Sequence, residues 1–122
     1  MSDSLLVDTN IVIYALKEVP HIKRLLDKRS IYVSFVTEIE LLSYPKNTSA
    51  DVQMIEIFLD SSYILEYSIP VKKTVIEIRK KYNLKMADAF IAASAIEYNL
   101  PLISSDPVFG KVSELNFLKV NP

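Results

Sequence analysis

The sequence contains no cysteine and only one glycine, and both shortages exclude familiar kinds of site. Without cysteine there can be no disulfides and no zinc–thiolate centres, which fits a cytoplasmic protein. The phosphate-binding loops of P-loop and dinucleotide-binding proteins need several glycines at fixed spacing. Gly110 stands alone in this chain, so both of these nucleotide-binding classes are excluded.

Long apolar runs and an excess of basic residues are also missing. The longest apolar or small runs, IVIYAL and AFIAASAI, are far shorter than the ~20 residues of a membrane span. The start MSDSLLVD lacks the basic segment and cleavage site of a secretory signal, so we expect a cytoplasmic protein without a membrane partner. The net charge of −1 gives no general sign of nucleic-acid binding, which would have to come from a local patch or from assembly.

What the chain does contain is enough apolar material for one core. Of its 122 residues, 50% are hydrophobic, and we expect a single domain over residues 1–122. Short apolar runs predict strands at 4–7, 31–36, 63–67, 101–104 and 116–120. Helical spacing predicts helices over 10–17, 21–28, 37–44, 49–60, 71–82 and 85–99, with a helical turn at 107–111. Strands that alternate with helices indicate an α/β fold with a mainly parallel central sheet.

Three acids lie at or just beyond the ends of predicted strands. Asp8 directly follows the first strand, Glu40 follows the second, and Asp106 follows the strand that ends at Ser104. In a parallel sheet the crevice beyond the carboxyl ends of the strands is where ligands bind. If the three strands are neighbours, their acids converge on one crevice.

Each of these acids also has a simpler interpretation as part of a helix cap. Asp8, Thr9 and Asn10 are all good N-cap residues, although one helix start needs only one of them. Thr37 and Glu40 have the spacing of a capping box. Asp106 precedes a proline, which is a favourable way to begin a helix. Taken one at a time, these residues leave both interpretations open.

A fourth acid, Asp88, begins a predicted helix that is apolar on almost every side. An acid in a first helical turn gains less than ~1 kcal/mol from the helix dipole at an exposed site, which does not explain an acid in a buried helix. Lys85, three residues earlier, or a metal ion could pair with it. Four clustered carboxylates raise one another's pKa unless a cation lies between them. Oxygen ligands without cysteine, and with a single histidine, favour Mg²⁺ or Mn²⁺.

Four segments together resemble the acidic motifs of PIN-domain nucleases, in particular of the VapC-type toxins of toxin–antitoxin pairs. The segments are LLVDTNIVIYAL, VSFVTEIELLSYP, LKMADAFIAASAI and LISSDPVF, and their order and spacing agree over nearly the whole chain. The resemblance implies a magnesium- or manganese-dependent endoribonuclease with a three-layer α/β/α sandwich fold. It also implies an RNA substrate, a cognate antitoxin as partner, and a homodimer or higher homo-oligomer.

The resemblance also implies roles for individual residues. The catalytic and metal-binding acids would be Asp8, Glu40, Asp88 and Asp106. The residues that support them would be Thr9, Asn10 and Ser104. Lys85 adjoins the expected crevice and is a candidate for contact with the substrate. Val108 stands where relatives often have a further acid, so the resemblance does not decide whether Asp106 binds metal directly.

Other interpretations compete with a ribonuclease toxin. A receiver-like signalling domain is also a parallel α/β fold with an acidic magnesium pocket, but such domains carry two adjacent acids after the first strand. A PIN-like module could process RNA without an antitoxin, or bind a partner without catalysis. The basic residues of segment 71–85 could attract RNA or could simply form the solvated face of a helix.

Overall fold

The structure, a computed structural model, describes residues 3–122 and is built around a five-stranded sheet. Its strands are β1 (Ser4–Val7), β2 (Ser30–Ser34), β3 (Tyr63–Leu65), β4 (Leu102–Ser104) and β5 (Phe117–Lys119). They lie in the order β3-β2-β1-β4-β5, and every neighbouring pair is parallel. The predicted α/β fold with a parallel sheet is confirmed. Receiver-like domains have the order 2-1-3-4-5, so that alternative is wrong.

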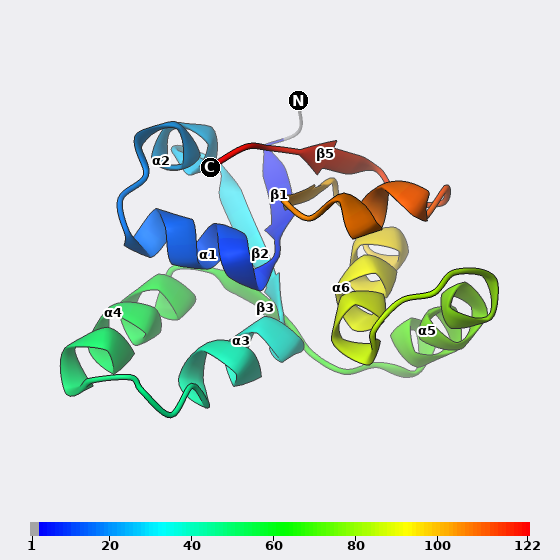
Figure 1. Cartoon of the computed structure of the whole chain (residues 1–122), viewed down its shortest axis with the longest axis horizontal. Coiled ribbons are helices and arrows are strands. Elements are labelled where there is room, and N and C mark those ends of the chain that lie inside the picture. The colour runs from blue at the N-terminus through cyan, green and yellow to red at the C-terminus, as the bar shows by residue number, and fades with distance from the viewer. Residues whose placement is uncertain (1–2) are drawn as a thin grey trace.

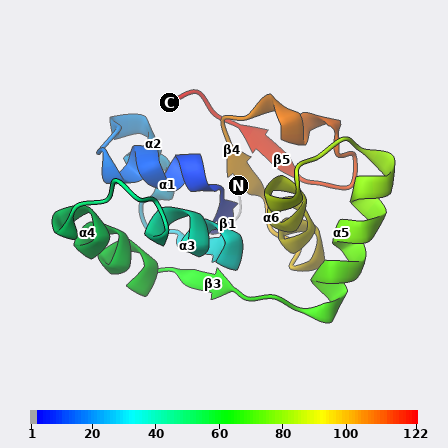
Figure 2. The same ribbon diagram turned by 60° about the horizontal axis from the view of Figure 1, so that its bottom comes forward.

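Helices cover both faces of this sheet and make a three-layer sandwich (Figures 1 and 2). One face carries α1 (Thr9–Leu16), α2 (Pro20–Leu26), α3 (Phe35–Leu42) and α4 (Ser49–Asp60). The other face carries α5 (Ile69–Lys81), α6 (Met86–Glu97) and the 3₁₀ helix η1 (Pro107–Lys111). Within residues 3–122, none of these helices has both the length and the apolar character that crossing a bilayer requires.

Residues 5–7 of the central strand β1 are apolar because helices cover both faces of the sheet. Leu5 and Val7 pack into the core on the α1–α4 side, whereas Leu6 packs into the core on the α5–α6 side. Successive strand residues point to opposite faces, and both faces are covered here, so each position needs an apolar side chain. The same alternation places Leu102 and Ile103 of β4 on opposite faces. The two strands that carry the candidate acids are therefore fixed from both sides.

The boundary between β2 and α3 differs from the sequence-based expectation. The β-branched and aromatic run 31–36 predicts a strand throughout, but β2 ends at Ser34 and α3 begins at Phe35. The Ser34 side chain accepts a hydrogen bond from the Val36 N–H at 3.1 Å and so caps the helix. Phe35 packs edge-on against Phe90 of α6, with ring centroids 5.4 Å apart. Capping and tertiary packing thus override the strand propensity of this run.

Candidate active site

Asp8 lies at the carboxyl end of β1 and is almost completely buried, with 5% of its surface exposed. Its Oδ1 accepts a hydrogen bond from the Ile11 N–H at 3.0 Å, which caps α1. Its other oxygen, Oδ2, accepts a hydrogen bond from the Ser104 hydroxyl. The capping interpretation of this residue is therefore correct, and it is compatible with a place in an acidic crevice.

Ser104, the last residue of β4, connects Asp8 to Asp106. Its fully buried hydroxyl donates to Asp8 and accepts a hydrogen bond from the Asp106 N–H at 3.0 Å. The Asp106 carboxylate in turn accepts from the Val108 N–H at 2.9 Å and caps η1. One serine on a central strand thus sets the relative positions of two acids whose helices begin at neighbouring strand ends.

Glu40 is held by α1 and not by the start of its own helix. The Thr9 hydroxyl donates to Glu40 Oε1 at 2.6 Å, and the Thr37 hydroxyl oxygen lies 3.1 Å from that of Thr9. The capping-box interpretation of Thr37 and Glu40 is wrong, because α3 begins at Phe35 and is capped by Ser34. Thr37 is a fully buried residue inside α3, where it supports Thr9.

Asp88 is the third residue of α6 and lies partly buried. The next residues of the helix are small or apolar and buried, namely Ala89, Ile91, Ala92, Ala93, Ser94 and Ala95. Lys85 is the N-cap residue of this helix, and its charge partly offsets the rise in the pKa of Asp88 that burial and the charge of Asp106 cause. The two side chains form no ion pair; the ion pairs among the described residues are Lys23–Glu18 and Lys81–Glu114.

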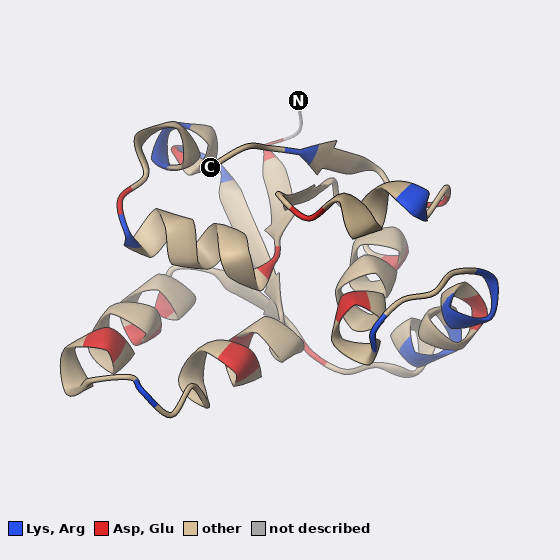
Figure 3. Ribbon diagram, in the orientation of Figure 1, with Lys and Arg blue, Asp and Glu red and all other residues tan. Residues whose placement is uncertain are grey.

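Two of the four acids, Asp8 and Asp88, have a raised pKa. Burial raises the pKa of Asp8, hydrogen bonds from Ser104 and Ile11 oppose this, and the charges of Asp106 and Asp88 raise it further. Burial also raises the pKa of Asp88, and the charges of Asp106 and Glu40 add to the effect. Carboxylates that repel one another in this way lie close together. Figure 3 shows the arrangement, with acidic positions at the start of α1, on α3, at the start of α6 and after β4.

The donor chemistry of this site fits a hard divalent cation. Carboxylate and hydroxyl oxygens are the groups that Mg²⁺ and Mn²⁺ prefer. Within residues 3–122, however, no three His, Cys, Asp or Glu side chains already form a metal-binding cluster. Magnesium commonly keeps several waters and uses one or two protein carboxylates, so a ready cluster of three is not required for its binding.

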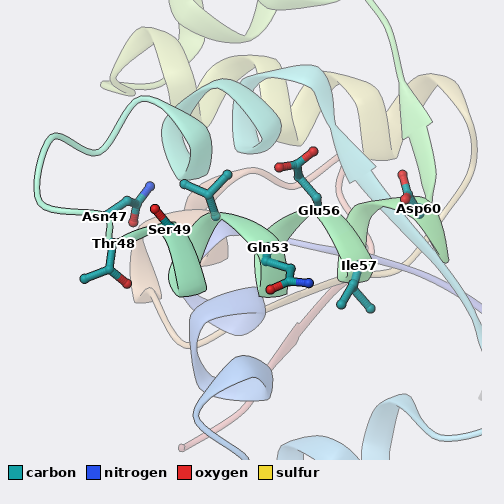
Figure 4. A pocket seen from close by; sticks show the side chains of 8 residues that line it. Asn47, Thr48, Ser49, Gln53, Glu56, Ile57 and Asp60 are labelled. Carbon is teal, nitrogen blue, oxygen red and sulfur yellow. The ribbon is translucent and has the colours of Figure 1, made fainter.

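Two hollows adjoin the acids. One, of about 550 Å³, lies toward α5 and α6 and is lined by Arg79, Asn83, Leu84, Lys85, Asp88, Asp106 and Val108. The other, of about 510 Å³, lies between α1, α3 and α4 and is lined by Thr9, Ile13, Leu16, Lys17, Glu40, Leu41, Tyr44, Asn47, Asp51, Met54 and Ile55. A further hollow of about 440 Å³ follows α4 and the turn before it, but none of the four acids lines it (Figure 4).

The structure brings together most of the residues that the sequence singles out. Thr9 and Ser104 contact the acids directly, and Lys85 lines the same hollow as Asp88. Asn10 is exposed on α1, and its side chain makes no hydrogen bond to the acids in the described part of the chain. Sequence reasoning did not single out Arg79 as a residue of the crevice. No local signal distinguishes it from the other basic residues of α5.

Known proteins share this fold. The family model described as PIN domain matches residues 5–115. The structure of VapBC2 from Rickettsia felis bound to a DNA fragment from their promoter is similar, with a TM-score of 0.87, 22% identity, and coverage of 97% of this chain and 99% of that one. A toxin–antitoxin complex from Klebsiella pneumoniae gives a TM-score of 0.79, 25% identity, and coverage of 91% and 94%.

A third similar structure is FitAcB from Neisseria gonorrhoeae, with a TM-score of 0.78, 22% identity, and coverage of 94% of this chain and 96% of that one. No curated protein matches the sequence. The similarity to these solved structures extends over nearly the full length of both chains in each case.

Proposed function

The chain belongs to the PIN domain family, and from this premise we propose that it is a Mg²⁺- or Mn²⁺-dependent endoribonuclease. Its active site would comprise Asp8, Glu40, Asp88 and Asp106. The observation that best supports this proposal is the raised pKa of Asp8 and Asp88, which burial causes and the charges of neighbouring acids increase. Two of them, Asp8 and Asp88, are harder to ionise than isolated carboxyls, and a bound cation would offset that cost.

The chain's own residues have distinct parts in such a site. Asp8 and Asp88 would hold the cation, with Glu40 and Asp106 beside it or linked to it through water. Ser104 and Thr9 would keep Asp8 and Glu40 in fixed orientations through the hydrogen bonds described above. When bound, a divalent cation supplies activation of water and charge stabilisation at a phosphodiester.

Cleavage of RNA by the full chain tests the proposal. The wild type should cut RNA in the presence of Mg²⁺ or Mn²⁺, and Asp8→Asn and Asp88→Asn should lose the activity. Glu38→Gln removes an acid from α3 two residues from Glu40, so it is the matched control and should retain cleavage. Equal cleavage by all four proteins would refute the role of the carboxylates, and no cleavage by the wild type with either ion would refute the enzyme.

We further propose that the enzyme is the toxin of a toxin–antitoxin pair. The similarity to solved toxin–antitoxin complexes supports this role. The hollow between α1, α3 and α4 supports it as well, because apolar side chains such as Leu16, Leu41 and Met54 line it. Glu40, one of the four acids, and its partner Thr9 line the same hollow. An antitoxin segment with an apolar face could lie in this hollow and extend a basic residue toward Glu40.

Bacterial growth distinguishes a toxin from a PIN-domain nuclease with another role in RNA processing. Expression of the wild-type chain without its antitoxin should arrest growth, whereas expression of Asp88→Asn at the same level should not. Co-expression of the product of a short neighbouring gene should restore growth. Normal growth with active enzyme would instead support RNA processing without an antitoxin.

A further inference from the structure

The hollow on the α5–α6 side of the acids contains cations as well as anions. Asp88 and Asp106 line it together with Arg79 and Lys85. None of these four residues belongs to either ion pair found among residues 3–122. Arg79 and Lys85 are therefore not held in ion pairs with the acids beside them. They remain available for an anion that enters the same hollow.

The guanidinium group of Arg79 is fixed in orientation although the residue is exposed. Its Nε donates to the Leu84 carbonyl oxygen at 3.2 Å, and its Nη1 lies 3.9 Å from Met86 Sδ, a weak acceptor. A guanidinium carries five N–H donors in a rigid fork, so several donors remain for another partner. The geometry of that fork suits the paired oxygens of a phosphate.

The loop that orients Arg79 is itself attached to the segment after Asp106. The Tyr82 hydroxyl donates to Glu114 Oε1 at 2.6 Å, and Lys111 Nζ donates to the Asn83 carbonyl oxygen at 2.9 Å. The Leu84 carbonyl follows directly in this loop. Arg79 is therefore held at a fixed place relative to both acids before any ligand binds.

We propose that Arg79 is a positioning residue that binds a phosphate of the RNA strand flanking the phosphate held at the acids. This inference rests on the proposed ribonuclease function and adds the substrate class that the site requires, a strand with at least two neighbouring phosphates. Arg79 does not touch the reacting atoms; it sets which phosphate of the strand reaches them. Lys85, closer along the chain to Asp88, would add positive charge on the same side.

Cleavage of short RNAs with single neutral linkages tests this inference. Replacing one flanking phosphate by a methylphosphonate should raise KM for the wild type by about 10-fold or more, as expected for the loss of a hydrogen bond to a charged group. Arg79→Met should raise KM for normal RNA by a similar factor, and it should no longer respond to that replacement. Arg79→Lys, which keeps the charge but loses the fork, should lie between the two.

Lys73→Met is the matched control, because it removes one charge from the same helix at a residue that lines neither adjoining hollow. It should keep the wild-type KM and the full response to the neutral linkage. If Arg79→Met responds to every neutral linkage as the wild type does, Arg79 does not bind a flanking phosphate and the inference is wrong.

Binding separates this inference from the proposed reaction. Full-length Asp88→Asn should bind a short single-stranded RNA, measured by fluorescence anisotropy, without cutting it. Adding Arg79→Met should reduce the slope of log K against log salt by about 0.7, the contribution of one phosphate contact on a single strand. Adding Lys73→Met should not change the slope. If Arg79→Met reduces the slope but the wild type does not cleave RNA, the ribonuclease proposal is wrong and the phosphate contact of Arg79 stands. An unchanged slope would mean that Arg79 does not contact a phosphate of the RNA strand.

Discussion

At the scale of single residues, one buried hydroxyl joins two parts of the candidate site. Ser104 donates to Asp8 and accepts from the Asp106 N–H, although Asp8 lies 96 positions earlier in the chain. A hydroxyl can do both because it carries one donor and two acceptor lone pairs. Without this hydroxyl, Asp8 and Asp106 would each lose a hydrogen bond that helps to hold them in place.

Replacement of this serine should therefore affect both stability and ionisation. Ser104→Ala leaves the partly buried Asp106 N–H and the buried Asp8 Oδ2 without partners and should lower the free energy of unfolding by roughly 1–3 kcal/mol. It should also raise the pKa of Asp8, since the Ser104 hydrogen bond lowers that pKa. Denaturant unfolding and carboxyl NMR titration measure the two effects.

The control for this replacement is another buried serine. Ser94 donates to the Phe90 carbonyl within α6, and that carbonyl belongs to a helix, so Ser94→Ala should change stability little. Equal losses in the two variants, with no change in the Asp8 titration, would mean that Ser104 only fills space.

In the absence of divalent ions, the ionised Asp88 side chain should lower the free energy of unfolding at neutral pH. Its pKa is raised by burial and by the charges of Asp106 and Glu40, so the folded state binds its proton more tightly than the unfolded state does. The free energy of unfolding therefore falls as pH rises from about 3.8 through the folded-state pKa. Asp88→Asn removes this loss and should be more stable than the wild type at pH 7.

The pH dependence checks the cause. In the presence of a chelator, the stability gain of Asp88→Asn should grow as pH rises through this window and then level off. Mg²⁺ should stabilise the wild type and leave the variant nearly unchanged. A gain that is the same at every pH would contradict an electrostatic origin.

Residues of the site differ in how far the sequence could reveal them. Asp8 follows β1 directly and Asp106 comes two residues after the end of β4, so their place at the sheet edge follows from the rule for parallel sheets. The partner of Glu40 could not be predicted, because Thr9 belongs to a different helix and a local capping box offered a competing explanation. Arg79 resembles its basic neighbours in sequence, and only the hydrogen bond to Leu84 in the folded chain distinguishes it.

At the scale of elements, the sequence predicts a helix accurately where the residues that cap it lie in the same segment. The helix over 49–60 is confirmed to the residue, since Thr48 and Asp51 form a capping box within the same segment. The start of α3 differs from the prediction because Phe35 and Val36 have strand propensity, whereas the Ser34 cap and the contact of Phe35 with Phe90 of α6 favour the helix. Sheet order and the pairing of β1 with β4 depend on contacts that no local pattern contains.

Glu114 provides one attachment of the loop between α5 and α6, and the hydrogen bond from Lys111 to the Asn83 carbonyl oxygen provides another. Hydrogen bonds from Tyr82 and Lys81 hold the pKa of Glu114 down at about 2. A depressed pKa means that this carboxylate stabilises the fold above its ordinary value of 4.5, and that the contribution is lost as pH falls toward 2. Glu114→Gln should abolish this pH-dependent part of the stability.

Local opening of the loop gives a direct measurement. In Glu114→Gln the Leu84 amide, which donates to the Tyr82 carbonyl at 3.1 Å, should exchange with solvent faster than in the wild type at pH 7. Amides within β1 should keep their wild-type exchange rates. Unchanged exchange at Leu84 would show that Lys111 alone holds the loop.

At the scale of the whole molecule, several large apolar side chains remain exposed. Ile76 on α5 and Met86 on α6 are each about half exposed, at 50% and 51%, and they line one hollow together with Phe90. Such surfaces in a protein of this size usually mark contacts with other chains. The homo-oligomer expected from the sequence stays a prediction, and this surface is a candidate for it.

Sedimentation equilibrium tests that prediction. The wild type should have a mass above the 13.9 kDa of one chain, and Ile76→Glu should shift it toward the monomer because a charge would be buried in the contact. Ile57, which is 63% exposed on α4 across the sheet, provides the control Ile57→Glu. A wild type that is monomeric at all concentrations would contradict the oligomer, and equal effects of the two variants would place the contact elsewhere.

The pairing of β1 with β4 has a consequence for the timing of activity during synthesis. Of the five strands, the central β1 is synthesised first, whereas its partner β4 with Ser104 is synthesised only after β2 and β3. A nascent chain can form the part of the sheet made by β1, β2 and β3 while the candidate active site still lacks β4 and Ser104. If the protein cuts RNA as proposed, it would remain inactive until β4 has been synthesised, and products terminated before Ser104 would be inert.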